Sequence, residues 1–300
     1  MTLRVFLVFC FLLFLPSCTP APKTATLALL GDLLLGRGVQ PSQSSLAYLA
    51  PDLQAADLVL ANLESPLAEV PPVESTAPGY NLCAPAANAQ FLAKWGLDLL
   101  SLANNHRADC SPDGTVATAG ILSAQGLASV GPGPQPLYRE INGLLIAFMA
   151  FDDILAPLDG PATVHAIQTA REEGTLVVVL VHWGVEYQAG ASDRQKDLAR
   201  QFAGAGAVLV VGTHPHVLQP VEWIVVGKMR TLVLYSLGNA LFDQSGLPDT
   251  RQSALVVVQL DGQGVQLARV VPFGIDVPGS RVESPDAQAA QQIRARLGME

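Results

Sequence analysis

Short apolar runs recur along the chain, and stretches with helical periodicity separate most of them. The runs are rich in Val, Leu and Ile without alternating polar residues, which is typical of strands that are buried on both faces of a sheet. Strands that alternate with helices in this order indicate an α/β domain with a largely parallel interior. The seven runs span residues 26–30, 58–61, 97–103, 144–151, 175–181, 207–211 and 231–235.

The segments between and after these runs predict the remaining elements. Asp193 begins one helical stretch and is its expected N-cap, and residues 254–260 and 265–272 predict a β-hairpin. The main domain is expected to cover residues 26–275, followed by a C-terminal extension, 276–300, with a last helix. Helices are predicted over 88–95, 115–125, 164–172, 193–205 and 285–297.

The balance of charge limits the class of protein. Lys and Arg number 17 and Asp and Glu number 26, so the formal net charge is −9, and half of the 300 residues are apolar. A disordered chain combines low hydrophobicity with high charge, so this composition excludes one. Phosphate contacts need a basic face, so the negative charge argues against a nucleic-acid partner.

The N-terminal segment is typical of a secreted protein. Residues 3–15 are apolar apart from one arginine; this run is shorter than the about 20 residues that a spanning helix needs, and its pattern is that of a secretory signal. The sequence LPSC at 15–18 resembles a bacterial lipobox, whose Cys is acylated. We therefore expect a signal peptide over 1–17, a tether over 18–25 and an extracytoplasmic protein anchored to the bacterial membrane through lipidated Cys18. An ordinary signal peptide cut nearby and an uncleaved anchor are the alternatives.

The cysteines divide between this segment and the domain. Cys10 would leave with the signal and Cys18 would carry lipid, so Cys83 and Cys110 remain. An oxidising location permits a disulfide between these two, and two buried free thiols are the alternative.

Polar side chains gather where the predicted strands stop. Ligands of α/β sheets bind outside the carboxyl ends of the strands, and four of the five histidines of the chain lie at such ends. Asp, Glu and Asn, which also coordinate metals, accompany them. The candidate residues are Asp32, Glu64, Asn105, His106, His182, His214 and His216.

The chemistry of this set indicates a divalent cation. Imidazole suits Mn, Fe or Zn and carboxylate or amide oxygen suits harder cations, so a mixed set favours Mn, Fe or Zn over Ca. Either one ion or two ions about 3.5–4 Å apart are expected, and a pair can activate water and neutralise a phosphoryl-like transition state. Pro215 favours extended backbone at the preceding residue, so His214 and His216 are expected to point the same way.

Each candidate also has a structural interpretation. Asp32 would cap a turn, Glu64 would be a solvated loop acid, and Asn105 and His106 would be hydrogen-bonding loop residues. His165 lies inside a predicted helix and is taken as structural.

Six ordered motifs resemble those of the bacterial capsule synthesis family (CapA, also called PgsA), which is associated with poly-γ-glutamate capsules. That family looks like a branch of the calcineurin-like metallophosphoesterases. The motifs specify the family more closely than the reaction. They are Gly31-Asp32-Leu33-Leu34-Leu35-Gly36-Arg37, Asn62-Leu63-Glu64-Ser65-Pro66, Leu102-Ala103-Asn104-Asn105-His106-Arg107-Ala108-Asp109, His182-Trp183-Gly184-Val185-Glu186-Tyr187, His214-Pro215-His216-Val217-Leu218-Gln219-Pro220 and Tyr235-Ser236-Leu237-Gly238-Asn239.

The resemblance implies a four-layer αββα sandwich of the metallo-dependent phosphatase type, with ions at the sheet ends. It implies that Glu64 takes the place of a bridging Asp and that His106 is the acid beside the amide ligand. The metal ligands that it implies are Asp32, Glu64, Asn105, His182, His214 and His216.

Two departures from the phosphoesterase pattern bear on the site. Leu34 stands where a His usually follows the first Asp, so one ion is expected to lack a ligand. Glu64 is one methylene longer than Asp, which is expected to change the metal spacing. Within the capsule family, Cys110 replaces a usual aromatic residue and Ala240 replaces a common Phe, and both are interpreted as local packing changes.

The leading hypothesis is a lipid-anchored metallohydrolase-like protein that makes or processes an anionic envelope polymer such as poly-γ-glutamate. His106 would protonate the leaving group. Arg37 would clamp a substrate carboxylate or phosphate, or else form a surface ion pair. The second hypothesis is a non-catalytic protein that binds or anchors the polymer through the same metal. A third is an ordinary phosphodiesterase unrelated to capsule.

Overall fold

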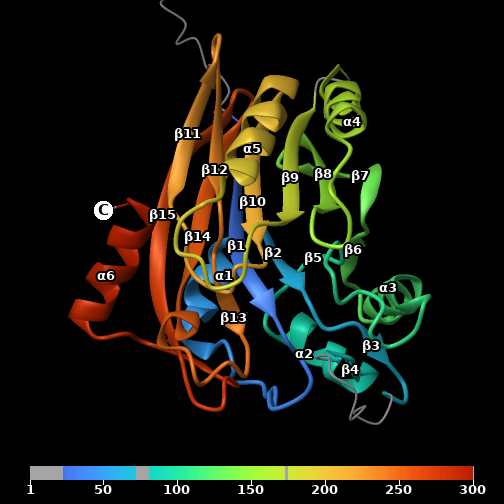
Figure 1. Ribbon diagram of the computed structural model, residues 1–300, viewed down its shortest axis with the longest axis vertical. Coiled ribbons are helices and arrows are strands. Elements are labelled where there is room, and N and C mark those ends of the chain that lie inside the picture. Colours follow the sequence, from blue (N-terminus) through green and yellow to red (C-terminus); the bar gives the residue numbers. More distant parts are fainter. Residues whose placement is uncertain (1–22, 72–80, 173–174, 300) are drawn as a thin grey trace, which may run out of the picture.

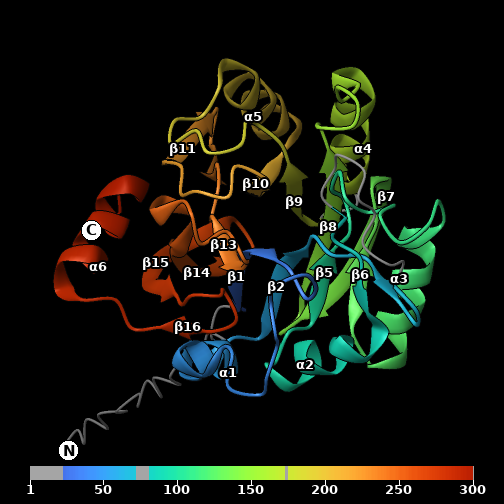
Figure 2. The same cartoon turned by 60° about the horizontal axis from the view of Figure 1, so that its bottom comes forward.

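Two β-sheets pack face to face, and helices cover their outer faces (Figures 1 and 2). The computed structural model describes residues 23–71, 81–172 and 175–299. The layers are helices, sheet, sheet and helices, so the four-layer αββα fold is confirmed. The expected signal peptide at 1–17, Cys18 and most of the expected tether lie outside the described residues.

The first sheet is built around β1 (Ala25–Leu33), which runs parallel to β2 (Leu58–Leu63) and to the short β13 (Asn239–Leu241). Beyond β2 the parallel arrangement continues, whereas beyond β1 the strands are antiparallel. In the described residues its order is β16 (Val282–Glu283), β15 (Gly264–Ile275), β14 (Gln252–Asp261), β1, β2, β5 (Leu99–Ser101) and β6 (Ala128–Val130).

The second sheet has a parallel centre and antiparallel edges. Its central strands are β12 (Met229–Leu234), β10 (Ala207–Thr213), β9 (Leu176–His182) and β8 (Leu144–Asp152). Strand β11 (Val221–Val226) lies at one edge and β7 (Gly133–Ile141) at the other. A separate pair joins β3 (Leu67–Ala68) to β4 (Ala84–Pro85).

Helices cover the outer faces of both sheets. The first sheet packs against α1 (Ala50–Ala55), α2 (Ala89–Lys94) and α3 (Gly114–Ala124), and the second against α4 (Gly160–Glu172) and α5 (Asp193–Ala205). Helix α6 (Ala287–Leu297) packs Ile293 and Leu297 on Ala254 of β14 and on Leu218. Short 3-10 helices occur at Ala47–Leu49, Ala86–Asn88 and Pro248–Arg251.

The buried strands explain why the apolar runs do not alternate. In β1, Leu27 and Leu29 face the core between the sheets, while Ala28 and Leu30 face the core under α1 and α2. Both faces of the strand are therefore removed from water, and neither favours polar residues.

Each of the seven predicted apolar runs overlaps a strand, although the strand ends differ from the predicted ends. Strand β1 continues through Gly31 and Asp32, whereas the run at 97–103 contributes only Leu99–Ser101. The C-terminal hairpin and the five expected helices are present. The expected N-cap was wrong, because Ser192 caps α5 in a capping box with Gln195, and Asp193 is the first helical residue.

Two further features bear on the sequence expectations. Cys83 and Cys110 form a disulfide with a Cα–Cα distance of 4.9 Å. The two cysteines are therefore cross-linked and are not free thiols. Within the described residues, none of the helices is both long enough and apolar enough to span a membrane.

Candidate metal centre

The carboxyl ends of β1, β2, β9 and β10 meet at one edge of the sandwich, the lower edge in Figure 1. Asp32 lies next to the last residue of β1, and Glu64 follows β2 directly. His182 is the last residue of β9, and His214 is the first residue after β10. The topology thus brings together side chains that are distant in sequence.

Gly31 sets the position of Asp32. A Cβ atom on Gly31 would lie 1.8 Å from the carbonyl oxygen of Gly238, and the N–H of Asp32 donates to that same oxygen at 3.0 Å. The absence of a side chain lets β13 approach β1 closely, and Asn239 then pairs in register with Asp32.

Asp32, Glu64 and His216 form a first group of ligand atoms. All three residues are buried, and one ligand atom from each lies within 4.8 Å of the others. His216 Nε2 is 3.7 Å from Glu64 Oε1, and His216 Nδ1 is 3.5 Å from Asp32 Oδ2.

The carboxylate of Glu64 tests whether these residues fit a cation. Both of its oxygens are buried, and neither has a hydrogen-bond partner among the described residues. Burial raises the pKa of Glu64 well above its usual value, against the pull of His216. A buried carboxylate without partners is costly, and a divalent cation would satisfy both oxygens; the residues therefore fit a metal.

Asn105, His182 and His214 form a second group. His182 Nε2 is 2.8 Å from Asn105 Oδ1 and 3.2 Å from His214 Nδ1. Two ligands at ~2.1 Å from a tetrahedral ion lie about 3.4 Å apart, so these separations are close to those of ligands that share an ion. The backbone N–H of His214 donates to Asp32 Oδ2 at 3.2 Å, which joins the two groups.

The histidines differ in charge. Burial and His214 hold the pKa of His182 well below its usual value, and burial and His216 lower that of His214 to about 4. Burial would also lower the pKa of His216, but Glu64 and Asp32 overcome it and raise this pKa to about 9. The second group therefore presents neutral imidazoles, the form that binds metals.

The loop geometry at the two last histidines was predicted wrongly. His214 has φ 97° and His216 has φ 58°, so the segment around Pro215 is a turn with left-handed residues and not an extended segment. Both imidazoles nevertheless reach the centre, with ring centroids 6.1 Å apart. Tertiary contacts, such as the bond from the His214 N–H to Asp32, favour this turn.

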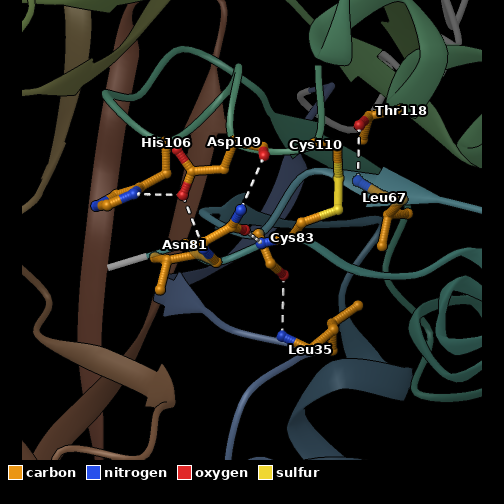
Figure 3. Close-up of a disulfide and its surroundings, with 10 residues drawn as sticks. Leu35, Leu67, Asn81, Cys83, His106, Asp109, Cys110 and Thr118 are labelled. Atoms are coloured by element: carbon orange, nitrogen blue, oxygen red, sulfur yellow. Dashed lines mark hydrogen bonds and ion pairs between the residues drawn. A yellow bond between two sulfur atoms is a disulfide. The ribbon is translucent and has the colours of Figure 1, made fainter. Parts of the chain in front are cut away.

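His106 lies on the wall of the cavity beside the first group. Its Nε2 is 3.9 Å from Glu64 Oε1, and its Nδ1 is 2.9 Å from Asp109 Oδ2. Figure 3 shows Asp109 next to the Cys83–Cys110 disulfide. The N–H of Leu82 donates to the same Asp109 oxygen at 2.7 Å, so the cross-linked segments hold the partner of His106.

Arg37 forms an ion pair with Asp243. Its Nε donates to Asp243 Oδ2 at 3.0 Å and its Nη2 to Asp243 Oδ1. The guanidinium also lies over the Phe242 ring, 5.4 Å from its centroid. The pair is mostly buried and lines the cavity, so it is not a surface ion pair of the ordinary kind.

A cavity of about 420 Å³ opens beside the centre. Glu64, His106 and His216 reach it from the strand ends, and Tyr187 and Glu186 line it from the loop after β9. The Tyr187 ring stacks on His216 with centroids 6.0 Å apart.

Two positions lie outside the centre. Leu34 is fully buried among the apolar residues under the helices of the first sheet, so it supplies no ligand. His165 lies exposed on α4 and takes no part in the centre; nor does it pack in the core.

Several asparagines of the centre were not among the sequence candidates. Asn62 Nδ2 donates to Asp32 Oδ1 at 2.8 Å, and Asn104 Nδ2 donates to Asn62 Oδ1 at 3.2 Å. Asn239 Oδ1 lies 2.9 Å from His216 Nδ1. All three follow predicted apolar runs, at 58–61, 97–103 and 231–235, within the quoted motifs, and that position was the available signal.

Solved structures of other proteins share this fold. In solved structures, a hypothetical protein from Thermus thermophilus is 19% identical with a TM-score of 0.55, covering 83% of this chain and 99% of that chain. The Thermus thermophilus sulfate thiohydrolase SoxB is 16% identical with a TM-score of 0.50, covering 93% of this chain and 61% of that chain. These likenesses concern the fold.

Sequence relatives identify the family. The PGA biosynthesis protein CapA of Bacillus subtilis (strain 168) is 32% identical over 86% of this chain and 74% of its own length. The capsule biosynthesis protein CapA of Bacillus anthracis is 31% identical over 83% of this chain and 67% of its own length. Residues 26–244 match the family described as bacterial capsule synthesis protein PGA_cap. With this family match and these two relatives, the chain belongs to the bacterial capsule synthesis protein family PGA_cap.

Proposed function

We propose that this protein is a metal-dependent hydrolase that acts on an anionic envelope polymer such as poly-γ-glutamate. The observation that carries the proposal is the cavity, where His106 and the unpartnered carboxylate of Glu64 face the same space. The names of the relatives, which refer to capsule and PGA biosynthesis, support the choice of polymer.

The metal would be held by the two groups of ligand atoms. Asp32, Glu64 and His216 would form one set and Asn105, His182 and His214 the other. When bound, Mn, Fe or Zn supplies Lewis acidity and lowers the pKa of a coordinated water. Glu64 has two buried oxygens without a hydrogen-bond partner, and both would be available to a cation.

His106 is placed to handle the proton of the leaving group. Because Asp109 accepts at Nδ1, the Nδ1 atom carries a hydrogen and Nε2 faces the cavity. A protonated His106 would donate from Nε2 to the departing oxygen or nitrogen, and Asp109 would stabilise the imidazolium before the transfer.

The charges of the cavity make anion binding depend on the cation. Asp243 balances Arg37, His216 faces Glu64, and Glu186 adds a negative charge to the wall. An anionic polymer would be repelled by this wall without a bound cation. The same dependence holds if the protein binds the polymer without cleaving it, and the buried Leu34, which cannot supply a ligand, favours this second function.

Hydrolysis is tested with the purified protein loaded with Mn²⁺ or Zn²⁺, on poly-γ-glutamate and on bis-p-nitrophenyl phosphate. We expect metal-dependent turnover of the polymer that His106→Ala lowers roughly 100-fold or more, while His165→Ala leaves it unchanged. Polymer binding without turnover of either substrate would support the binding function instead. Turnover of the phosphodiester alone would support an ordinary phosphodiesterase.

The metal centre is tested by elemental analysis. His216→Ala is expected to lower the metal bound per chain, whereas the exposed His165→Ala is the matched control and should keep the wild-type content. Equal metal content in the two variants would count against the centre.

We also propose an extracytoplasmic location with a lipid anchor on Cys18. The Cys83–Cys110 disulfide supports an oxidising compartment. Mass spectrometry of the membrane fraction should find an acylated N-terminal Cys18, and Cys18→Ser should release the protein from membranes. An unacylated N-terminus at another residue would refute the anchor.

A further inference from the structure

Asn239 is a fully buried amide whose hydrogen bonds leave it a single orientation. Its Nδ2 donates to the backbone carbonyl of Thr250 at 3.1 Å and to Gln244 Oε1 at 3.0 Å. A backbone carbonyl can only accept, so the Nδ2 atom must face Thr250. The Oδ1 atom must then face His216, 2.9 Å from its Nδ1.

This orientation determines which nitrogen of His216 carries a hydrogen. An amide oxygen can only accept, so His216 Nδ1 must donate to it. In the neutral imidazole the lone pair is therefore on Nε2. That atom is the one near Glu64 Oε1, at 3.7 Å.

We propose that Asn239 is a positioning residue that makes Nε2 of His216 the metal-binding atom. The inference rests on the proposed metal centre and adds a residue that contacts no metal itself. Histidine ligands are commonly oriented by an acceptor at the other ring nitrogen, and here a backbone carbonyl at Thr250 fixes that acceptor in turn.

The surroundings of the imidazole restrict its rotation as well. Phe242 lies on one side, with ring centroids 4.7 Å apart, and Tyr187 stacks at 6.0 Å. Gln244 Nε2 donates to the Tyr187 hydroxyl at 3.1 Å. The cavity wall, Asn239 and His216 are thus connected by direct contacts.

Asn239 would have a purely structural role if it only held the loop around Thr250 against β13. Two substitutions separate the roles. Asn239→Asp keeps an oxygen acceptor for His216 but cannot donate to Thr250, whereas Asn239→Leu removes both bonds at similar volume. Asn88→Leu is the control. It also removes a hydrogen bond from an asparagine Nδ2 to a backbone carbonyl, in this case that of Leu35 at 2.8 Å.

The test measures Zn²⁺ affinity of the full chain by titration calorimetry, with Zn²⁺ alone as the probe. We expect Asn239→Leu to weaken binding roughly 10- to 100-fold, and Asn239→Asp and Asn88→Leu to stay within about threefold of the wild type. NMR chemical shifts of the His216 imidazole carbons and nitrogens, in the zinc-loaded wild type and in Asn239→Asp, should show that His216 binds zinc through Nε2.

The outcomes distinguish this proposal from the proposed function. If the wild type binds no zinc, the metal centre and the positioning role both fail. If the wild type binds zinc and Asn239→Asp loses as much affinity as Asn239→Leu, the role of Asn239 is to hold the loop, and the positioning proposal alone is overturned. Ligation of the wild type through Nδ1 would overturn it as well, and the Asp variant keeps the test decisive if the Leu variant does not fold.

Discussion

At the scale of single residues, the centre contains two kinds of histidine. His182 and His214 are buried and have lowered pKa values, because burial and the neighbouring imidazoles oppose a positive charge. The pKa of His216, also buried, is raised to about 9, because it faces Glu64 and Asp32. The metal-free protein therefore holds a proton at His216, beside Glu64 and Asp32.

This proton gives a residue-scale prediction. A ligand imidazole must be neutral, so metal binding near pH 7.5 should release about one proton per chain from His216, since that pH lies below its pKa. Release should fall toward zero as the pH rises through about 9. Calorimetry in buffers of different ionisation enthalpy measures it.

The matched variants make this prediction specific. His216→Gln should release fewer protons than the wild type, and the exposed His165→Gln should match the wild type. A wild-type titration without proton release between about pH 7 and 8 would contradict the charge state assigned to His216.

At the scale of elements, the disulfide joins two segments that the sheets alone do not hold. Cys83 precedes β4, and Cys110 follows the loop that carries His106 and Asp109 (Figure 3). The N–H of Leu82 and the side chain of Asn81 reach Asp109 across the same junction. The cross-link therefore limits the separation of the His106 loop from this segment.

The element-scale prediction concerns this cross-link. The cysteines are 27 residues apart, and closing a loop of this size is worth about 3.5 kcal/mol of unfolding free energy. The double variant Cys83→Ser, Cys110→Ser should lose about that much in urea unfolding. Dithiothreitol should destabilise the wild type similarly and leave the double variant unaffected; equal stability of oxidised and reduced wild type would contradict the prediction.

At the scale of the whole molecule, the centre lies where both sheets end. The residues proposed as its ligands lie in β1 and directly after β2 in one sheet, and in β9 and the loop after β10 in the other. A cation that binds them all would link the two sheets. Unfolding would release it, so binding adds to the stability of the entire fold.

The corresponding prediction is a metal-dependent rise in thermal stability. At a free metal concentration 100 times its Kd, the native state gains about 2.7 kcal/mol, which should raise the Tm by several degrees. Scanning calorimetry with Mn²⁺ or Zn²⁺, followed by EDTA, measures it. His216→Ala should reduce the rise and His165→Ala should keep it; a Tm unaffected by metal in the wild type would argue against a centre shared by the two sheets.

The sequence by itself determined the central strands of both sheets, the C-terminal hairpin, five of the described α-helices and the side chains at the strand ends. In β9, residues 176–181 are apolar on both faces because both faces are buried, so the pattern is visible without the fold. The polar residues that follow such runs were visible for the same reason, since they interrupt the apolar run. Short elements such as β13 were not predicted, because they depend on contacts with β1 rather than on local pattern.

The tertiary structure alone decided how these side chains are used. The turn at His214 and His216, the ion pair of Arg37 with Asp243, and the orientation of Asn239 all depend on partners distant in the sequence. Local propensity favoured an extended segment before Pro215, and long-range hydrogen bonds outweighed it. Periodicity records which faces of an element are buried, whereas the partner of each polar atom is set by the packing of whole sheets.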